Sequence, residues 1–381
     1  MSTIVPFFDV QTGFERQLPR IKSRIRQIFD DGDVGNNTKA VRRFECALAA
    51  YTGAKFAIAV GNASDGLTII LKAAGMGPDY EVIVPPLTFV SSASSVIHAG
   101  GKVVFADIDP YTYGIDPASV ESAITENTRA IMPVHLFHQP ADLPALTALA
   151  KRRGVEILED AAEAIGMRIE GSHAGLWGRA GVLSFFPTKT LSCFGDGGAI
   201  LTNDATMAET CILLRDHGRR QGGVVECPGF GSRLDSIQAA ILESRLEDLE
   251  QEIARREQIA RLYCERLAPL APHLSVPVVP ARPYRFNPVW YVFVVEAERR
   301  DELAAFLAER GIGTETYYPL PLHLQPAFAA LGYKPGDFPV AERVSSRTLA
   351  LPLFPELSDG SAEYVCARIF DFYSGGCRKC K

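Results

Sequence analysis

The chain has 381 residues, of which 47% are hydrophobic and 22% charged, and its formal net charge is -6. This length allows one large hydrophobic core and a second, smaller one. The mild acidity and the lack of a basic stripe exclude a nucleic-acid partner, and no apolar run reaches the roughly 20 residues that a membrane-spanning helix needs.

The N-terminal residues and the cysteines predict a cytoplasmic protein. The opening stretch, MSTIVPFFDV, lacks the basic and apolar regions of a secretory signal. The eight cysteines show no disulfide-like spacing, so we expect reduced thiols. One CxxC pair, Cys377 and Cys380, lies in the basic tail GGCRKCK, where we expect disorder and no metal site.

Two amphipathic helices are predicted first. The first covers Gly13 to Asp30, where apolar residues recur at helical spacing. The residues between the two helices, 31–39, have turn chemistry throughout. The second helix carries an apolar face made of Val41, Phe44, Leu48 and Tyr51.

From Ala54 onward, short apolar runs alternate with helical stretches. The apolar runs are Phe56–Val60, Glu81–Val84, Lys102–Ala106, Ala130–Val134, Val155–Leu158, Val182–Phe186 and Ala199–Leu201. The helical stretches are Asp65–Ala74, Ser91–His98, Pro117–Ile124 and Leu143–Arg152. Strands that are buried on both faces and alternate with helices predict an α/β domain with a mostly parallel, seven-stranded sheet between helices.

The last third of the chain predicts a smaller α+β domain. A long helix after Ser236, with an apolar stripe from Ile237 to Ile253, is expected to join the two domains. The elements that follow are a strand (Val289–Val295), a helix (Arg300–Arg310), a strand at 349–355 and a C-terminal helix (Ala362–Phe372). We therefore expect a large domain at 1–245 and a small domain at 246–381.

The stretch SFFPTKTLSCFGDGGAILTN, residues 184–203, places Lys189 between two apolar strands. Desolvation there would lower the pKa of the ammonium and make the neutral, nucleophilic amine accessible. A Schiff-base lysine needs this property. The alternative for the stretch in isolation is an ordinary lysine on an exposed turn.

A phosphate site is predicted at GNASDGL, residues 61–67, between a strand and a helix. Ser64 and Asp65 are expected at N-cap positions, where free N–H groups and the positive helix end favour an anion. Asp65 would cap the helix with its side chain while its N–H faces the phosphate. An ordinary capped helix start is the alternative.

Three further residues would form one cofactor-binding site together with these two stretches. Asp160, in EILEDAAEAIG, follows a buried strand and could keep a pyridine nitrogen protonated. Phe89, in PPLTFVSS, could stack on a flat ring, although a lone aromatic is more often part of the core. Ser184 could donate to a phosphate. The combination indicates pyridoxal phosphate.

A series of stretches, in this order, resembles the DegT-type nucleotide-sugar aminotransferases over about residues 5 to 357. They are GNASDGL, VIVPPLTFVSSASSV, FADIDPYTYGIDP, IMPVHLFHQPADL, EDAAEAIG, SFFPTKTLSCFGDGGAILTND, GSRLDSIQAAIL and YYPLPLHLQPAF. The resemblance implies a fold-type I homodimer with its active sites at the subunit interface. It also implies pyridoxal phosphate, with pyridoxamine phosphate as an intermediate form, and L-glutamate as the amino donor to a keto sugar on a nucleoside diphosphate.

The resemblance also implies roles for individual residues. Lys189 would be the Schiff-base lysine and general base, Asp160 would pair with the pyridine nitrogen, and Phe89 would stack on the ring. Ser64, Asp65 and Ser184 would contact the cofactor phosphate.

Three positions depart from the family pattern. Glu163, near the cofactor's 3′-oxygen, stands where the family often has Gln. Gly231 stands where many members have an Asn that reaches the partner's cofactor phosphate. The third departure is the loop DVGNNT, residues 33–38, which differs from the aromatic-plus-GPE version usual in the family and would form part of the substrate wall.

Several alternatives remain at this point. SFFPTK together with YYPLPLHLQPAF favours a 3-keto sugar, such as a 3-keto-6-deoxy sugar of amino-sugar, antibiotic or surface-polysaccharide biosynthesis, whereas EDAAEAIG resembles members acting on 4-keto sugars. Arg233 is a candidate for the diphosphate, and Tyr317, Tyr318 and His323 for the sugar, with packing between domains as the alternative for the tyrosines. A non-catalytic, cofactor-binding regulatory protein is the alternative from a different class.

Overall fold

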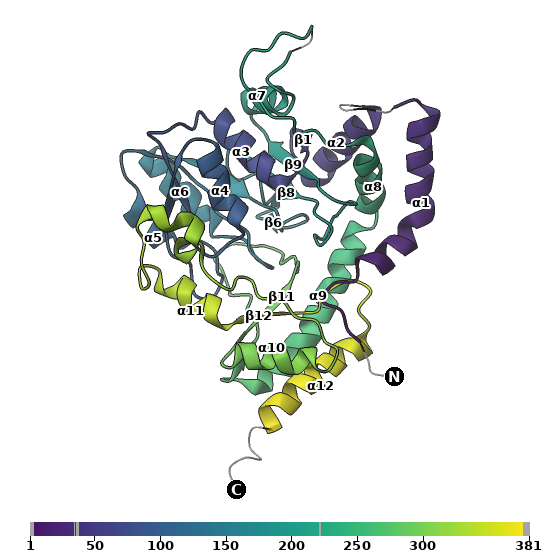
Figure 1. Cartoon of the computed structure of the whole chain (residues 1–381), viewed down its shortest axis with the longest axis vertical. Helices are drawn as coiled ribbons and strands as arrows, with labels where there is room; N and C mark the ends of the chain where they lie inside the picture. Colours follow the sequence, from purple (N-terminus) through teal and green to yellow (C-terminus); the bar gives the residue numbers. More distant parts are fainter. Residues whose placement is uncertain (1–3, 34, 36–37, 221, 376–381) are drawn as a thin grey trace.

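The computed structural model describes residues 4–33, 35, 38–220 and 222–375. A seven-stranded sheet lies between helices in the upper body of the molecule, and a three-stranded sheet lies in the lower body (Figure 1). The predicted fold class, α/β with a smaller α+β part, is confirmed. The CxxC pair of the tail and part of the predicted turn at 31–39 lie outside the described residues.

All seven predicted strands of the large sheet form. In chain order they are β1 (Phe56–Val60), β2 (Glu81–Val84), β3 (Lys102–Phe105), β4 (Thr128–Ile131), β5 (Glu156–Asp160), β8 (Ala180–Ser184) and β9 (Gly198–Thr202). Their spatial order is β1-β9-β8-β5-β4-β2-β3. Only β9 runs antiparallel to its neighbours, and the other pairs are parallel, as a mostly parallel sheet requires.

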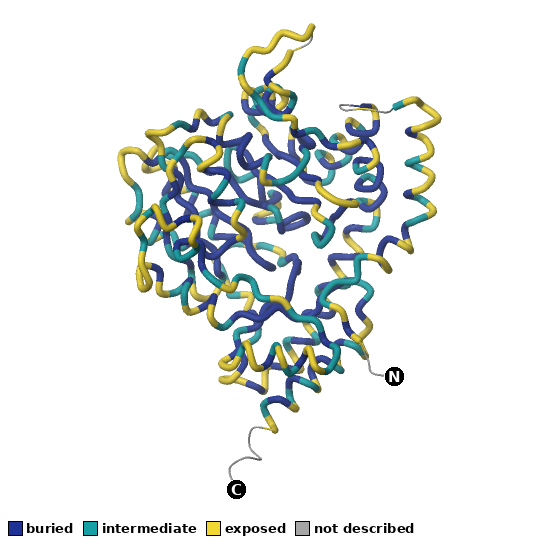
Figure 2. The backbone as a smooth tube through the Cα atoms, viewed as in Figure 1, coloured by how far each residue is buried: buried dark blue, intermediate teal, exposed yellow. Residues whose placement is uncertain are grey.

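Alternation along each strand assigns its side chains to two covered faces. Ile58 and Val60 pack on one face with α3 (Ala63–Ala73), α4 (Val90–His98) and α7 (Ala205–Arg215). Ala57 and Ala59 pack on the other face with α1 (Val10–Asp30), α2 (Lys39–Thr52) and α8 (Ser236–Leu246). Farther along the sheet, α5 (Pro117–Ala123) and α6 (Leu143–Arg153) form a separate cluster with β2, β4 and β5. The sheet is therefore buried on both sides (Figure 2).

The small sheet has its own core. Its strands are β10 (Leu274–Ser275), β11 (Phe293–Ala297) and β12 (Thr348–Leu351), and its helices are α9 (Leu249–Leu267), α10 (Arg300–Ala308), α11 (Pro339–Arg347) and α12 (Asp359–Gly375). The short elements are β6 (Arg168–Ile169), β7 (Ser172–His173), η1 (Ala268–Leu270), η2 (Leu322–Leu324) and η3 (Pro326–Leu331). Val5 packs in this core and forms an isolated bridge with Ile312, so the N-terminal segment packs against the C-terminal part of the chain.

The single long helix predicted after Ser236 is wrong, because the chain forms two helices, α8 and α9. Leu246 and Leu249 keep helical spacing across the break, and the apolar pattern therefore conceals it. Asp248, at the break, accepts hydrogen bonds from Arg20 and Gln17 of α1. Ile237 is 43% exposed and does not belong to the buried stripe. We keep the division at 245/246 as a proposal, which the break between the helices supports.

The segment 135–139 connects the large sheet to the small one. The His138 ring stacks on Trp290 with centroids 4.2 Å apart, and its Nε2 donates to the carbonyl of Val278 at 3.3 Å. Backbone hydrogen bonds run from Val289 to the carbonyl of His138 and from Tyr291 to that of Phe137. Because His138 is fully buried, its pKa falls to about 4.

We predict that acid weakens the fold through His138. The unfolded-state pKa of His138 is near the ordinary 6.5. Below that pH, His138 therefore binds a proton in the unfolded chain but not in the native chain. The free energy of unfolding should therefore fall by roughly 1.4 kcal/mol per pH unit between about pH 6.5 and 4 from this group alone. Urea unfolding at pH 7 and pH 5 measures the difference.

In His138→Asn this pH dependence should be shallower, although the buried His173, whose pKa also falls to about 4, keeps part of it. The exposed His98, at the end of α4, provides the matched control, His98→Asn, which should behave as the wild type. Equal pH dependence in all three proteins would contradict the prediction.

Candidate active site

The carboxyl ends of β1, β2, β5 and β8 meet at one edge of the large sheet. Both β1 and β8 are antiparallel to β9, and β8 is parallel to β5, so all four strands run the same way. Ligands of open α/β sheets bind at this edge. The segments that leave it carry the predicted cofactor residues, which are Ser64, Asp65, Phe89, Asp160, Glu163, Ser184 and Lys189.

Side-chain contacts link these segments to one another. Ser64 and Ser91 share a hydrogen bond of 2.6 Å between the first turns of α3 and α4. Ser92, the next residue of α4, donates to Asp160 at 2.7 Å. The structure thus joins the predicted phosphate end to the predicted pyridine end through one helix start.

The carboxylate of Asp160 is held in a fixed orientation. It is 4% exposed, and its Oδ1 accepts the N–H of Ala162 at 3.2 Å while its Oδ2 accepts the Ser92 hydroxyl. Thr88 and Ser92 share a hydrogen bond of 2.9 Å, and because Ser92 gives its proton to Asp160, Thr88 must be the donor in that pair. The Ser92 contact was not predicted, although its position in PPLTFVSS on the helix after Phe89 was a usable signal.

Lys189 forms an ion pair with Glu163, with Nζ 3.1 Å from Oε1. Its Nζ also lies 4.1 Å from the centroid of the Tyr291 ring. The predicted lowering of the lysine pKa is wrong for this arrangement. Burial alone would lower the pKa of the Lys189 ammonium, but the charge of Glu163, with smaller contributions from Tyr291 and Asp160, outweighs it and raises the pKa above its ordinary value.

Tyr291 was missed by sequence reasoning because it is about a hundred residues from Lys189 in the chain. It precedes β11, within a run that the sequence reads as a core strand, and it is 4% exposed. Its hydroxyl lies 3.1 Å from the Thr188 hydroxyl. No local pattern distinguishes this tyrosine from other core aromatics.

The phosphate end differs from the prediction in its cap. Helix α3 begins at Ala63, and its N-cap is Asn62, whose side chain accepts the N–H of Asp65 at 2.8 Å. That N–H is therefore not directed at a ligand, and Asp65 lies in the first turn instead of at the cap. The N–H groups of Ala63 and Ser64 remain at the start of the helix, where an anion is favoured.

Phe89 and Ser184 both lie at the carboxyl-end edge of the large sheet, and their predicted roles stay predictions. Phe89 is 57% exposed at the N-cap position of α4, so it is not a core residue, and its ring is 6.4 Å from that of Tyr318. Ser184 is the last residue of β8, directly before the segment that carries Lys189.

Arg233 lies close to the predicted phosphate site, but its side chain is paired with an acidic residue. Its guanidinium donates to Asp216 at 2.6 Å, and the neighbouring Ser232 accepts the N–H of Gly61 at 3.1 Å. At Gly231, the His217 ring occupies the space of a side chain, since an added Cβ would lie 3.0 Å from its Cε1. A larger residue at 231 would have to displace this ring.

The loop 313–328 contributes aromatic rings to the same region. Tyr317 is half-buried and lies 6.1 Å from Phe7 and 6.4 Å from Phe137 between ring centroids. His323, by contrast, is 1% exposed and packs on Phe338 while it contacts Glu342 at 3.1 Å. Its side chain belongs to the core, and we do not retain it as a substrate contact.

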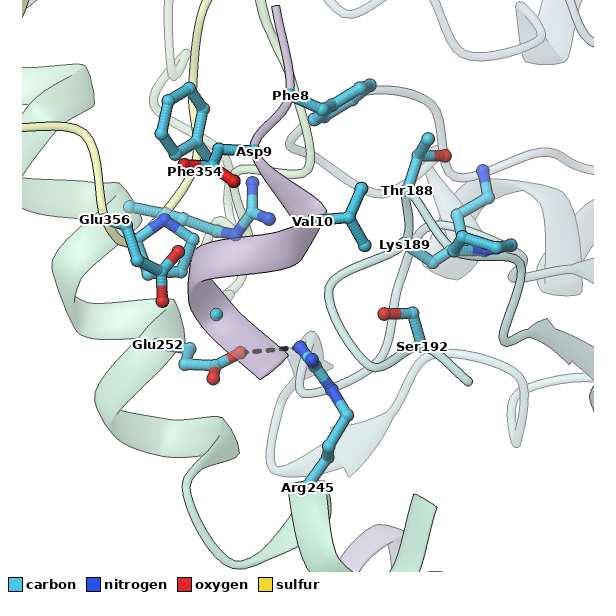
Figure 3. Close-up of a pocket in the computed structure, with 14 residues that line it drawn as sticks. Phe8, Asp9, Val10, Thr188, Lys189, Ser192, Arg245, Glu252, Phe354 and Glu356 are labelled. Atoms are coloured by element: carbon cyan, nitrogen blue, oxygen red, sulfur yellow. Dashed lines mark hydrogen bonds and ion pairs between the residues drawn. The ribbon is translucent and has the colours of Figure 1, made fainter. Parts of the chain in front are cut away.

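A small charged cavity lies beside the Lys189 segment, between it and the start of α1 (Figure 3). Arg245 and Glu252 pair across it at 3.2 Å. Its volume of about 30 Å³ suits a water molecule or two and is too small for a sugar. In Figure 3 the amine of Lys189 points away from Arg245, so the reactive side of the lysine is the side of Glu163 and Tyr291.

The residues fit pyridoxal phosphate. A free helix start stands beside the hydroxyls of Ser64 and Ser91, which suits the phosphate. Donors orient both oxygens of Asp160, and a side chain held in this way could accept a hydrogen bond from a protonated ring nitrogen. An exposed aromatic, Phe89, and a half-buried lysine complete the set.

Comparison with known proteins gives one consistent result. The sequence model of the DegT/DnrJ/EryC1/StrS aminotransferase family matches residues 17–370. A "pleiotropic regulatory protein" of Geobacillus stearothermophilus is 44% identical over 374 residues, 97% of this chain and 98% of that protein. The dTDP-3-amino-3,4,6-trideoxy-alpha-D-glucose transaminase of Streptomyces venezuelae is 40% identical, covering 93% and 92%. The crystal structure of S. venezuelae DesV with a ketimine intermediate superposes with a TM-score of 0.93 at 39% identity, covering 97% and 99%.

We predict that Ser92→Ala destabilises the fold. The buried Asp160 carboxylate would lose its side-chain donor, and an unsatisfied buried acceptor costs about 1–3 kcal/mol. Urea unfolding at pH 7 measures this loss. Ser122→Ala is the matched control, because the Ser122 hydroxyl is exposed and bonds only the carbonyl one helical turn back. Equal stability of the two variants would show that the hydrogen bond to Asp160 contributes nothing.

Proposed function

The chain belongs to the DegT/DnrJ/EryC1/StrS aminotransferase family, and on this premise we propose that it transfers an amino group from L-glutamate to a nucleotide-linked 3-keto sugar. It is a sugar aminotransferase that uses pyridoxal phosphate. The observation that carries the proposal is the meeting of Lys189, Asp160 and a free helix start at one sheet edge.

Each residue has a task that follows from its position. When bound, pyridoxal phosphate supplies an electron sink for the carbanion formed beside the substrate nitrogen. Asp160 would hold a proton on the ring nitrogen, and the start of α3 with Ser64 would hold the phosphate. Phe89 would keep the ring plane fixed and exclude water from one side.

Lys189 is the proposed base that moves the proton. Once its amine is free, it could take the proton from the carbon bearing the donor's nitrogen and return one to the carbon on the other side of that nitrogen. Glu163 forms an ion pair with the lysine and would orient its amine during this transfer. The same two movements in reverse would place the amine on the keto sugar.

Amination at C3 is supported by the sequence stretches noted above and by one relative. The transaminase of S. venezuelae carries the 3-amino position in its name, and it is 40% identical to this chain. Tyr317 and Tyr318 are the proposed contacts for the sugar, and Arg233 is proposed for the diphosphate after release from Asp216. A 4-keto substrate is the alternative.

The predicted cytoplasmic location stays a prediction; in the described chain, no helix has the length and apolarity to span a membrane.

The proposal is tested by incubating the purified protein with L-glutamate and a dTDP-linked 3-keto or 4-keto sugar. We expect an amino sugar from the 3-keto substrate, with the amine located at C3 by NMR. Lys189→Ala should form no product, because the substitution removes the proposed base. Product from the 4-keto sugar alone would exclude C3 amination, and near-normal turnover in Lys189→Ala would exclude the assigned base.

We further propose a homodimer with its active sites at the interface. Near Lys189, Phe186 and Phe194 are 49% and 47% exposed. An open apolar groove lies beside them, lined chiefly by Val10, Phe14, Leu18 and Pro187. Exposed apolar surface of this kind marks an interaction site. Light scattering coupled to gel filtration should give twice the mass of one chain, and Phe194→Asp should shift the protein toward the monomer. A monomeric wild type would refute the dimer.

A further inference from the structure

We propose that Glu163 and Tyr291 together form a binding site for the amine of Lys189, which we call the seat. The seat holds the amine as an ammonium ion in one position whenever the lysine is not bonded to the cofactor. It thereby sets how fast the amine reacts with an aldehyde. The inference rests on Lys189 as the cofactor-binding lysine of the proposed function. It adds two positioning residues and a control over the first step, the capture of the cofactor.

The seat has an anionic side and an aromatic side. Oε1 of Glu163 lies 3.1 Å from Nζ, and the Tyr291 ring centroid lies 4.1 Å from it. Both partners are buried, at 8% and 4% exposure, so water screens the interactions little. A carboxylate and an aromatic face together are a favourable environment for an ammonium ion.

One backbone residue holds both sides of the seat. The N–H of Phe137 donates to Oε2 of Glu163 at 2.8 Å, and its carbonyl accepts the N–H of Tyr291 at 3.0 Å. Phe137 adopts a left-handed backbone, with a φ of 67°, which is uncommon for a bulky residue. It is 1% exposed, so the surrounding core maintains this conformation.

Tyr291 is also fixed through its hydroxyl. The hydroxyl lies 3.1 Å from that of Thr188, the residue before Lys189. The seat is therefore tied to the lysine's own segment, to the turn after β5 that carries Glu163 and to the small-sheet segment that carries Tyr291. A contact held from three elements is suited to positioning, not only to packing.

The charged and titratable groups around Lys189 favour its protonated form. Burial lowers the pKa of Lys189, but the nearby groups raise it, with the largest contribution from Glu163 and smaller ones from Tyr291 and Asp160. Tyr317 and Tyr318 also stand near Glu163, and burial together with that carboxylate raises the pKa of both hydroxyls, so they remain neutral. Negative charge facing Lys189 thus comes from the two carboxylates of the β5 end and the turn after it.

The seat governs capture because only a neutral amine attacks an aldehyde. The ammonium first loses a proton to solvent; the amine then forms a C=N bond with the aldehyde carbon, and the aldehyde oxygen leaves as water. Stabilising the ammonium reduces the neutral fraction and slows capture tenfold for each unit by which the pKa rises. A purely structural ion pair would have no effect on this rate once the fold is intact.

The test measures the reactivity of the Lys189 amine without the cofactor. Protein freed of cofactor with L-glutamate and dialysis is pulsed with acetic anhydride at several pH values, and acetylation of Lys189 is quantified by mass spectrometry. At pH 8 we expect acetylation about tenfold faster in Glu163→Gln, which removes the charge but keeps an acceptor for Phe137. We expect a smaller increase, about threefold, in Tyr291→Leu. Glu121→Gln, on the outer helix α5, removes a charge elsewhere and should match the wild type within twofold.

A second readout is the rate at which added pyridoxal phosphate develops its visible absorbance, which should rise in Glu163→Gln in parallel with acetylation. A folded Glu163→Gln whose acetylation stays within twofold of wild type, or slows, overturns the seat. If that variant does not fold, an unchanged rate in a folded Tyr291→Leu overturns it instead. Wild-type protein that captures no pyridoxal phosphate refutes the cofactor assignment itself, which is a separate outcome.

Discussion

The common direction of β1, β2, β5 and β8 is the constraint on which the site depends. Because β9 runs antiparallel between β1 and β8, the two strands point the same way, and their carboxyl ends reach the same edge as β5. If β1 or β8 ran in the opposite direction, the predicted phosphate site, Asp160 and Lys189 would not all lie at the same edge of the sheet. The hydrogen bonds of Ser91 and Ser92 then tie the strand ends to one another through the start of α4.

The second constraint joins the two sheets. Segment 135–139 leaves the large sheet after β4 and forms backbone hydrogen bonds with the residues that precede β11. These bonds place Tyr291, which comes just before a strand of the small sheet, at a site formed mainly by the large sheet. Its uncommon backbone at Phe137 lets one residue bond a carboxylate and a tyrosine backbone at once. The fold thus places a residue of the C-terminal part within 4.1 Å of the lysine amine.

Charge balance at Lys189 shows why burial alone is a poor guide to reactivity. Desolvation disfavours the ammonium, but a carboxylate 3.1 Å away in the same low-dielectric environment favours it more. The net direction depends on which partner the fold brings in, and Glu163 and Lys189 are 26 residues apart. Arg233 is likewise paired with a carboxylate, that of Asp216, at 2.6 Å.

The amino-acid sequence by itself determined the seven strands, the helices between them and the positions of Lys189 and Asp160, because periodic burial and strand ends are local properties. Only the tertiary structure decided the break before α9, the burial of His323 and the contacts made by Ser92 and Tyr291. These depend on segments far apart in the chain that meet when the sheets pack, and no local pattern encodes which side chains then share a hydrogen bond or a charge.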